Sequence, residues 1–304
     1  MRPYDPSYIY DPETFAVNRL PAVSDHDCYR TLEEACADQS SLHVCLNGDW
    51  QFFYTENPAD CPDNFWLPDF DRSSWGQIKV PGHIQLQGYG TPQYVNVQYP
   101  WDGHERLTPP EFPSKNPTGC YARAFVLPEN WAGERVVLTF HGVESVLYCW
   151  VNGQFIGYGE DGFTPSRFDI TDALRQGENL LVVQVIRFAA CTWLEDQDFW
   201  RFSGIIRDVT LTALPRAHVE DVYVRTELSE HFTKAVVNTQ VKVAQYPGTE
   251  VQLTAQLLDA AGAPTQGVPE VPSMGDDALD VTMSGRVSAG AYPILDFRKP
   301  FTPN

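Results

Sequence analysis

The sequence is poor in positive charge. It has 21 lysines and arginines against 40 aspartates and glutamates, which gives a formal net charge of −19. Binding to nucleic acid or to an anionic membrane depends on a basic patch that releases counterions, and no such patch is available here. The composition therefore excludes nucleic acid and membranes as expected partners, and it favours neutral or cationic ligands.

Long apolar runs and cysteine pairs with metal-ligand spacing are also missing. No stretch approaches the ~20 residues of a membrane span, and residues 1–6 have no apolar segment that would begin a secretory signal. The cysteines are odd in number, seven in all: Cys28, Cys36, Cys45, Cys61, Cys120, Cys149 and Cys191. We expect them to be reduced and the protein to be cytoplasmic.

The material for a core is plentiful, because 43% of the residues are hydrophobic and 13% are aromatic. The length of 304 residues favours about two domains. Residues 1–45 are rich in proline and aspartate and are predicted to form an arm, with one short helix at 31–37 begun by a Thr31/Glu34 capping pattern. Short apolar segments after residue 46 predict strands near 50–54, 120–127, 135–140, 146–151, 154–158, 179–187 and 208–214.

Turn signals refine this pattern. Asn152-Gly153 predicts a two-residue hairpin, and residues 168–177 are predicted to form a capped helical corner that stops at Gly177. Residues 81–120 show no long periodic element and are expected to form a long ordered loop. The fold class is therefore predicted as all-β: a jelly-roll (galactose-binding-domain-like) β-sandwich over 46–216, followed by a second sandwich of immunoglobulin type over 217–304. The second sandwich is expected to be incomplete, because residues 286–304 lack alternation.

Residues 191–204 are predicted to form a loop in which acids and aromatic rings alternate. Three carboxylates, Glu195, Asp196 and Asp198, fall within four residues and are flanked by Trp193 and Trp200. Carboxylates accept hydroxyl protons and ligate hard cations, and aromatic faces cover the apolar face of a pyranose, so the loop is suited to a cation, a sugar or both. The alternative is structural: nearby arginines would neutralise the acids and the rings would belong to the core.

Four segments together resemble the N-terminal part of family 2 glycoside hydrolases, most closely the large bacterial β-galactosidases. These segments are Asn116 to Tyr121, Val151 to Tyr158, Leu194 to Arg201 and Ser203 to Val209. The similarity runs from about residue 47 to about residue 243. It implies an arm (1–45), a jelly-roll sugar-binding domain (46–216) and an incomplete immunoglobulin-like domain (217–304), with the catalytic (β/α)₈ barrel absent.

The resemblance implies no catalytic residue in this chain. The family retains configuration by using two glutamates on barrel strand ends. Its acid/base glutamate follows an asparagine, and no asparagine of this sequence is followed by glutamate. Glu195 and Asp198 are not expected to act as a self-contained acid and base, because two acids on one short loop are poorly placed for that chemistry.

Two residues of the sugar subsite are implied by position. Asn96 matches the loop asparagine that contacts galactosyl hydroxyls. Asp198 matches an acid that contacts the sugar and contributes to a sodium site whose other ligands lie in the barrel. The family also uses magnesium; Asp11 and Glu160 align roughly with that site, but Ala190 stands where an acid would be expected.

Three hypotheses follow from the resemblance. The chain is the non-catalytic N-terminal portion of a β-galactosidase, a stand-alone carbohydrate-binding module, or a complementing fragment that docks on a barrel-bearing chain. Alone, it is expected to bind no metal strongly, to bind β-galactosides weakly or not at all, and to self-associate or dock on a barrel-bearing chain. The sequence leaves open whether its length reflects a chosen boundary, a split gene or a frameshift.

Overall fold

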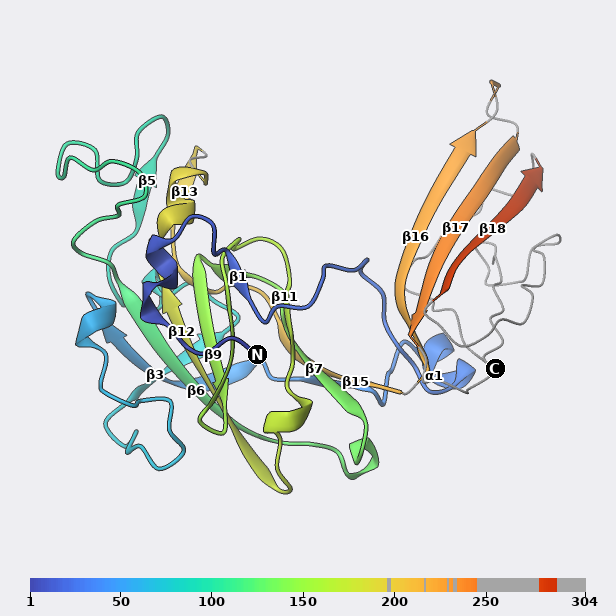
Figure 1. Cartoon of the computed structure of the whole chain (residues 1–304), viewed down its shortest axis with the longest axis horizontal. Helices are drawn as coiled ribbons and strands as arrows, with labels where there is room; N and C mark the ends of the chain where they lie inside the picture. The colour runs from blue at the N-terminus through green and yellow to red at the C-terminus, as the bar shows by residue number, and fades with distance from the viewer. Residues whose placement is uncertain (196–197, 216, 229, 232–233, 245–278, 289–304) are drawn as a thin grey trace. The chain divides into compact units, whose positions relative to one another are not determined.

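The computed structural model describes residues 1–195, 198–215, 217–228, 230–231, 234–244 and 279–288. The chain divides into two compact units, one made of residues 1–22 and 44–212 and the other of residues 23–43 and 213–304 (Figure 1). Helix is scarce, with one short α-helix, α1 (Leu32–Ala37), among the described residues. The predicted all-β class is confirmed.

The first unit contains two main sheets. The larger has seven strands in the order β1 (Ala16–Val17), β10 (Gln154–Gly159), β9 (Val146–Val151), β12 (Glu178–Ile186), β6 (Thr118–Val126), β3 (Gly48–Thr55) and β4 (Gly76–Val80). The smaller has four strands in the order β11 (Ser166–Asp169), β7 (Arg135–Phe140), β15 (Val209–Leu214) and β2 (His43–Cys45). All seven strands predicted from apolar segments after residue 46 are therefore present, and their ends coincide with the prediction or are shifted by one or two residues.

The seven-stranded sheet is buried on both faces at its central strands. All six residues of β9 are buried, as expected for a strand that is covered on two sides. Tyr148 and Trp150 of β9 pack with Tyr8 and Phe65, which belong to the N-terminal segment and to the β3–β4 connection. On the opposite face, Phe168 of β11 reaches Gly157 of β10, so the two sheets form the layers of a sandwich.

The Asn152-Gly153 hairpin is confirmed. Both residues have positive φ, 52° and 84°, and join β9 to β10. The Asn152 amide fixes this corner, because Nδ2 donates to Asn179 Oδ1 at 2.8 Å and Oδ1 accepts from the Leu180 backbone N–H at 3.0 Å.

The prediction of a helical corner at 168–177 is wrong. Phe168 and Asp169 end strand β11, and the helical part is a single 3-10 turn, η5 (Thr171–Ala173). The Asp169 carboxylate accepts from the Thr171 backbone N–H at 3.1 Å and from Thr171 Oγ1 at 2.6 Å. An aspartate that satisfies backbone donors locally competes with helix continuation, which explains the short turn.

The two predicted loops contain short strands. Residues 81–120 include η3 (Gln85–Gln87), β5 (Gln93–Val95) and the start of β6. Residues 191–204 include the end of η6 (Ala190–Trp193), the strand β13 (Phe199–Arg201) and the first residue of β14 (Gly204–Ile205). β5 pairs with β13, and β14 pairs with β8 (Val143–Glu144). The expectation of loops without periodic structure is corrected, because each strand is too short to show alternation and is held by a partner distant in sequence.

The second unit has an antiparallel sheet in the order β16 (His218–Leu228), β17 (Lys234–Ala244) and β18 (Leu279–Ser288). Residues 23–43 belong to this unit: the Ser24 backbone N–H donates to Asp221 Oδ1 at 2.7 Å. Helix α1 begins as predicted, with Thr31 Oγ1 accepting from the Glu34 N–H. Residues 245–278 and the end of the chain after residue 288 lie outside the described residues.

The remaining 3-10 turns are η1 (Pro6–Tyr10), η2 (Pro58–Asp60) and η4 (Glu129–Trp131). No helix in the described ranges has the length and apolar character that crossing a bilayer requires.

Candidate functional site

The β5–β13 ladder brings the two predicted sugar-site residues together. Val95 pairs with Phe199 in antiparallel register, so Asn96, which follows Val95, and Asp198, which precedes Phe199, emerge at the same end of the ladder. Both side chains are exposed. The structure thus places at one location two residues that are about 100 positions apart in the sequence.

Tyr94 is a partner of Asp198 that the sequence did not reveal. Its hydroxyl donates to Asp198 Oδ1 at 2.5 Å, and this hydrogen bond raises the pKa of Tyr94. The sequence carries no local signal for this contact, because it depends on the register of β5 against β13. Tyr94 and Asn96 present a phenol and an amide beside one carboxylate.

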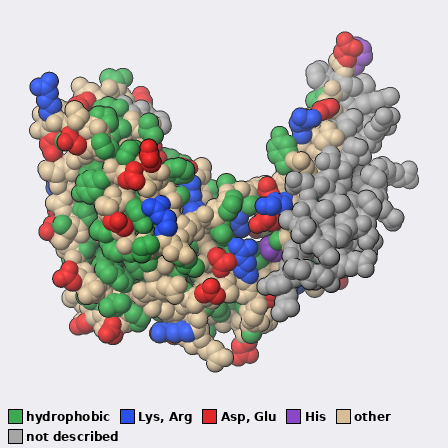
Figure 2. All heavy atoms as spheres, in the orientation of Figure 1, with side chains coloured by type: hydrophobic (Ala, Val, Ile, Leu, Met, Phe, Trp, Pro, Cys, Tyr) green, Lys and Arg blue, Asp and Glu red, His purple; other side chains and the backbone are tan. Residues whose placement is uncertain are grey.

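Aromatic rings continue from this point. The Tyr94 ring lies 5.6 Å from that of Trp200, and Trp200 stacks on Phe202 at 5.8 Å. Tyr94 and Trp200 are each 52% exposed. Figure 2 shows hydrophobic side chains gathered on the visible face of the first unit, with acidic side chains among them. Exposed rings next to a carboxylate and an amide can take up a sugar, with the rings against its apolar face.

A second aromatic group anchors the loop that follows β5. Tyr99 stacks on Trp101 at 5.0 Å, and Trp193 of η6 lies 4.6 Å from Tyr99 and 4.7 Å from Trp101. The Trp193 indole N–H donates to the Glu111 carbonyl at 2.6 Å. Trp101 is buried. These contacts tie residues 99–111 to the segment that precedes Asp198.

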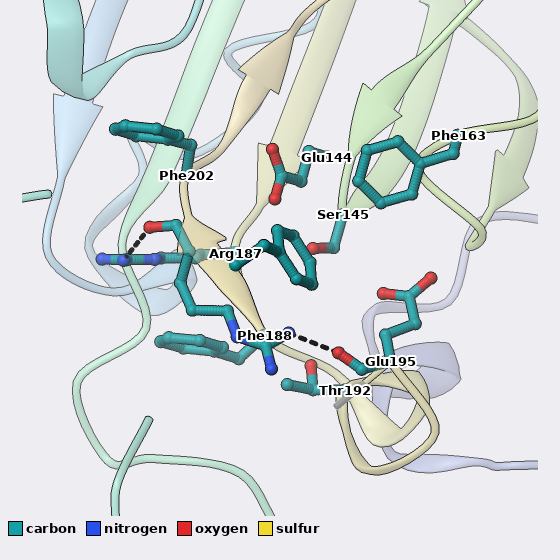
Figure 3. Close-up of a pocket in the computed structure, with 10 residues that line it drawn as sticks. Glu144, Ser145, Phe163, Arg187, Phe188, Thr192, Glu195 and Phe202 are labelled. Atoms are coloured by element: carbon teal, nitrogen blue, oxygen red, sulfur yellow. Dashed lines mark hydrogen bonds between the residues drawn. The ribbon is translucent and has the colours of Figure 1, made fainter. Parts of the chain in front are cut away.

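Two buried arginines hold the backbone around β13. Arg187 donates to the carbonyl of Arg201, and Arg201 donates to the carbonyl of Glu195 (Figure 3). Desolvation lowers the pKa of Arg187 from its ordinary value. Arg207 likewise donates to a backbone carbonyl, that of Phe163, at 2.7 Å. The charge of Arg201 also partly offsets the desolvation of Glu195. Neutralisation of the acids by Arg201 and Arg207 therefore stays a prediction.

Glu144 and Glu195 line a small pocket next to these arginines (Figure 3). Desolvation raises the pKa of Glu144 to about 7 and also raises the pKa of Glu195. The pocket has room for about one water molecule, whereas small-molecule sites enclose hundreds of Å³. Asp198 is not among its lining residues. The pocket therefore cannot enclose a sugar, and it does not join Glu195 to Asp198 as an acid and base.

The metal ligands suggested by the resemblance, Asp11 and Glu160, make hydrogen bonds within this chain. No group of three or more His, Cys, Asp or Glu side chains suited to a metal occurs among the described residues. The Asp11 carboxylate accepts from Thr14 Oγ1 at 2.7 Å and from the Glu13 N–H at 3.0 Å. Glu160 is buried and accepts from the Tyr158 hydroxyl, and desolvation raises its pKa to about 7.

The segments that carry the family resemblance also brace the site. Buried Asn116 donates to the Phe188 carbonyl at 2.8 Å and accepts from its N–H at 2.9 Å. Gln85 exchanges hydrogen bonds with Ser203, at 2.9 Å to Oγ and 3.0 Å from the backbone N–H. These hydrogen bonds fix the segments on both sides of residues 189–202. Much of the sequence pattern that carries the resemblance therefore holds the backbone of the site in place.

Comparison with known proteins gives matches over most of this chain. Residues 44–215 match the model described as "Glycosyl hydrolases family 2, sugar binding domain". A β-galactosidase of Halalkalibacterium halodurans is 48% identical over 84% of this chain, and the match covers 26% of that protein. A β-galactosidase large subunit of Leuconostoc lactis is 41% identical over 80% of this chain and is covered to 41%. This chain thus spans about a quarter to two fifths of those relatives.

Among solved structures, a Bacteroides uniformis β-glucuronidase superposes with a TM-score of 0.62 at 22% identity. The match covers 81% of this chain and 28% of that one. At this identity the likeness concerns the fold.

Proposed function

We propose that this chain, which belongs to glycoside hydrolase family 2, supplies the non-catalytic part of the sugar-binding site of a β-galactosidase. The observation that carries the proposal is the β5–β13 register, which puts Asn96 beside Asp198 on an exposed edge. Relatives at 41% and 48% identity are named β-galactosidases, which supports terminal β-galactosides as the substrate of the complete enzyme. The acid and nucleophile then come from a barrel outside this chain.

Asn96 and Asp198 are assigned to galactosyl hydroxyls. An amide donates and accepts, while an ionised carboxylate accepts from two hydroxyls or binds a cation through its oxygens. Asp198 keeps one oxygen engaged with Tyr94 and can direct the other outward. One carboxylate is too few ligands for sodium, so a sodium site is completed by groups from the barrel.

The proposed partner is a barrel-bearing polypeptide. Several relatives carry the name "large subunit", which supports assembly from more than one chain in this group of proteins. Exposed apolar side chains near the ladder, such as Val97 and Leu194, are suited to such a contact or to self-association. The proposal places the assembled enzyme in the cytoplasm.

The test is reconstitution. The chain is mixed with the portion of the H. halodurans β-galactosidase that this chain does not match, and hydrolysis of a nitrophenyl β-galactoside is measured. We expect each part alone to be inactive and the mixture to be active, with Asp198→Asn abolishing most of the activity.

Asp63→Asn provides the matched control, because Asp63 is an exposed aspartate on the β3–β4 connection. It should leave the reconstituted activity unchanged. Hydrolysis by the purified chain alone that Asp198→Asn removes would refute the non-catalytic assignment. A mixture that stays active with Asp198→Asn would refute the assignment of Asp198 to the sugar-binding site.

A further inference from the structure

Two cysteines that are distant in sequence meet on one face of the large sheet. Cys61 follows η2 on the β3–β4 connection, and Cys120 is the third residue of β6. Their sulfurs are 3.4 Å apart. Gln184 of β12 is the register partner of Cys120, and its Nε2 donates to Cys61 Sγ at 3.3 Å. The pair therefore sits at a fixed point where three segments converge.

The two thiols are not equivalent. Cys61 is half-buried, whereas Cys120 has no exposed surface. The hydrogen bond from Cys120, aided by that from Gln184, lowers the pKa of Cys61, while burial raises the pKa of Cys120. Cys61 thus has the greater thiolate character and the better access, the two properties that decide reactivity. Cys120 is screened from solvent but lies within reach of Cys61.

We propose that Cys61 and Cys120 form a redox couple that a hydroperoxide converts into an intramolecular disulfide. In the first step the Cys61 thiolate attacks the terminal peroxide oxygen, the O–O bond breaks, and an alcohol leaves with a proton from solvent, giving a sulfenic acid. In the second step the Cys120 sulfur attacks the Cys61 sulfur, and the hydroxyl leaves as water with the Cys120 proton. Two thiols are oxidised and one peroxide is reduced.

The geometry permits the bond with a small movement. An S–S bond measures about 2.05 Å, so the sulfurs must approach by about 1.4 Å. Cys120 is fixed in a central strand, between β3 and β12. Cys61 lies outside regular structure, just beyond a 3-10 turn, and can supply the movement.

The bond would change the stability of the first unit. It would link the β3–β4 connection to a central strand, closing a chain segment of about 60 residues. Such a link restricts the unfolded chain, so oxidation should raise the melting temperature of the first unit by several degrees. All eight tryptophans fall within residues 44–212, so their fluorescence follows this unit alone.

The experiment oxidises the full chain with tert-butyl hydroperoxide, blocks the remaining thiols with iodoacetamide, and maps the peptides by mass spectrometry without reduction. We expect a linked Cys61–Cys120 peptide pair, two fewer alkylated cysteines, and a rise in melting temperature that dithiothreitol reverses. Gln184→Met should slow the appearance of the link several-fold, because it removes the donor to the Cys61 sulfur.

Cys149→Ala is the matched control. Cys149 is as buried as Cys120, but its side chain lies on the opposite face of the sheet, donating to the Gly157 carbonyl at 3.7 Å. This variant should form the link at the normal rate, and Cys61→Ser should not form it. Unreacted Cys61 and Cys120, a sulfinic acid on Cys61 without a link, or bridges confined to other cysteines would each overturn the proposal. The map of the unaltered chain decides this even where a variant does not fold.

Discussion

Tyr94, Asn96 and Asp198 occupy one end of the β5–β13 ladder, and the fold constrains them to different degrees. The Tyr94 hydroxyl and the Asp198 carboxylate hold each other at 2.5 Å. Asn96 is exposed, and its Oδ1 accepts from the adjacent Val97 N–H at 2.7 Å. Asn96 therefore contributes little to packing, and its substitution should affect sugar binding rather than stability.

Asn96→Ala should leave the free energy of unfolding within about ±0.5 kcal/mol of the unaltered chain, since exposed loop substitutions rarely do more. In the reconstituted enzyme it should lower kcat/KM roughly 3- to 10-fold, the cost of losing a hydrogen bond to a neutral hydroxyl. Urea unfolding followed by tryptophan fluorescence and nitrophenyl galactoside kinetics measure the two effects. Equal kinetics with a large loss of stability would show that Asn96 is structural.

Glu144 makes the stability of the first unit depend on pH. Burial raises its pKa to about 7 in the fold, against an ordinary value near 4.5, because Arg187 and Arg201 only partly offset desolvation. His83 Nδ1 lies 3.8 Å from its carboxylate, and burial lowers the pKa of His83. Folding therefore takes up a proton at Glu144 between about pH 4.5 and pH 7, and stability is lost as the pH rises through this window.

Glu144→Gln should reduce this pH dependence by an amount on the order of 1–3 kcal/mol between pH 5 and pH 7.5. Burial raises the pKa of Glu160 to a similar value, so part of the slope should remain in the variant. Urea unfolding at several pH values, followed by tryptophan fluorescence, gives the slope. An unchanged slope would mean that Glu144 is ionised in the fold. Glu129→Gln, which alters a glutamate in the 3-10 turn η4, serves as a control for the substitution itself.

At the scale of elements, the sequence was informative where structure is local. The Asn152-Gly153 turn and the long strands β6, β9 and β12 follow from adjacent residues and were predicted. The β5–β13 pair was missed because each strand has three residues and its partner lies about 100 residues away. The buried Arg187 and Arg201, which hold the site backbone, carry no local signal because their partners are backbone carbonyls.

Family resemblance supplies what local pattern does not. It points to Asn96 and Asp198 through their positions in the sequence, and the ladder explains how two such distant residues meet. It gives no hint of Tyr94, because the contact that defines the role of Tyr94 depends on the ladder register. The roles of Asn96 and Asp198 as sugar ligands stay a prediction that reconstitution tests.

The packing of the two sheets depends on Gly157 of β10, which lies at a bulge opposite Cys149. A Cβ there would collide with the Phe168 ring and approach the Val17 carbonyl oxygen to 2.7 Å. Gly157→Ala should therefore cost about 1–3 kcal/mol, as overpacking does in tight cores. At Gly76 of β4 a Cβ would meet the movable Tyr89 hydroxyl at 3.1 Å, so Gly76→Ala is a matched control with a smaller effect. Equal effects in urea unfolding would contradict this account of the interface.

At the scale of the whole molecule, two properties oppose each other. The net charge of −19 makes copies of the chain repel one another. Near the ladder, Val97 and Leu194 are 84% and 85% exposed, and Tyr94 and Trp200 add half-exposed rings. Apolar surface of this kind favours association, so the balance between copies depends on how far salt screens the charge.

The chain should therefore associate more strongly as salt is raised, the reverse of binding driven by charge. Raising the ionic strength from about 0.05 M to about 0.5 M shortens the screening length several-fold and weakens the repulsion, while the apolar contact persists. Sedimentation velocity over a concentration series should show a dissociation constant that falls several-fold. Leu194→Ser should weaken association, whereas Leu228→Ser, which alters an exposed leucine of the second unit, should not. A monomer at every salt concentration, or an equal effect of the two variants, would show that the ladder surface is not the contact.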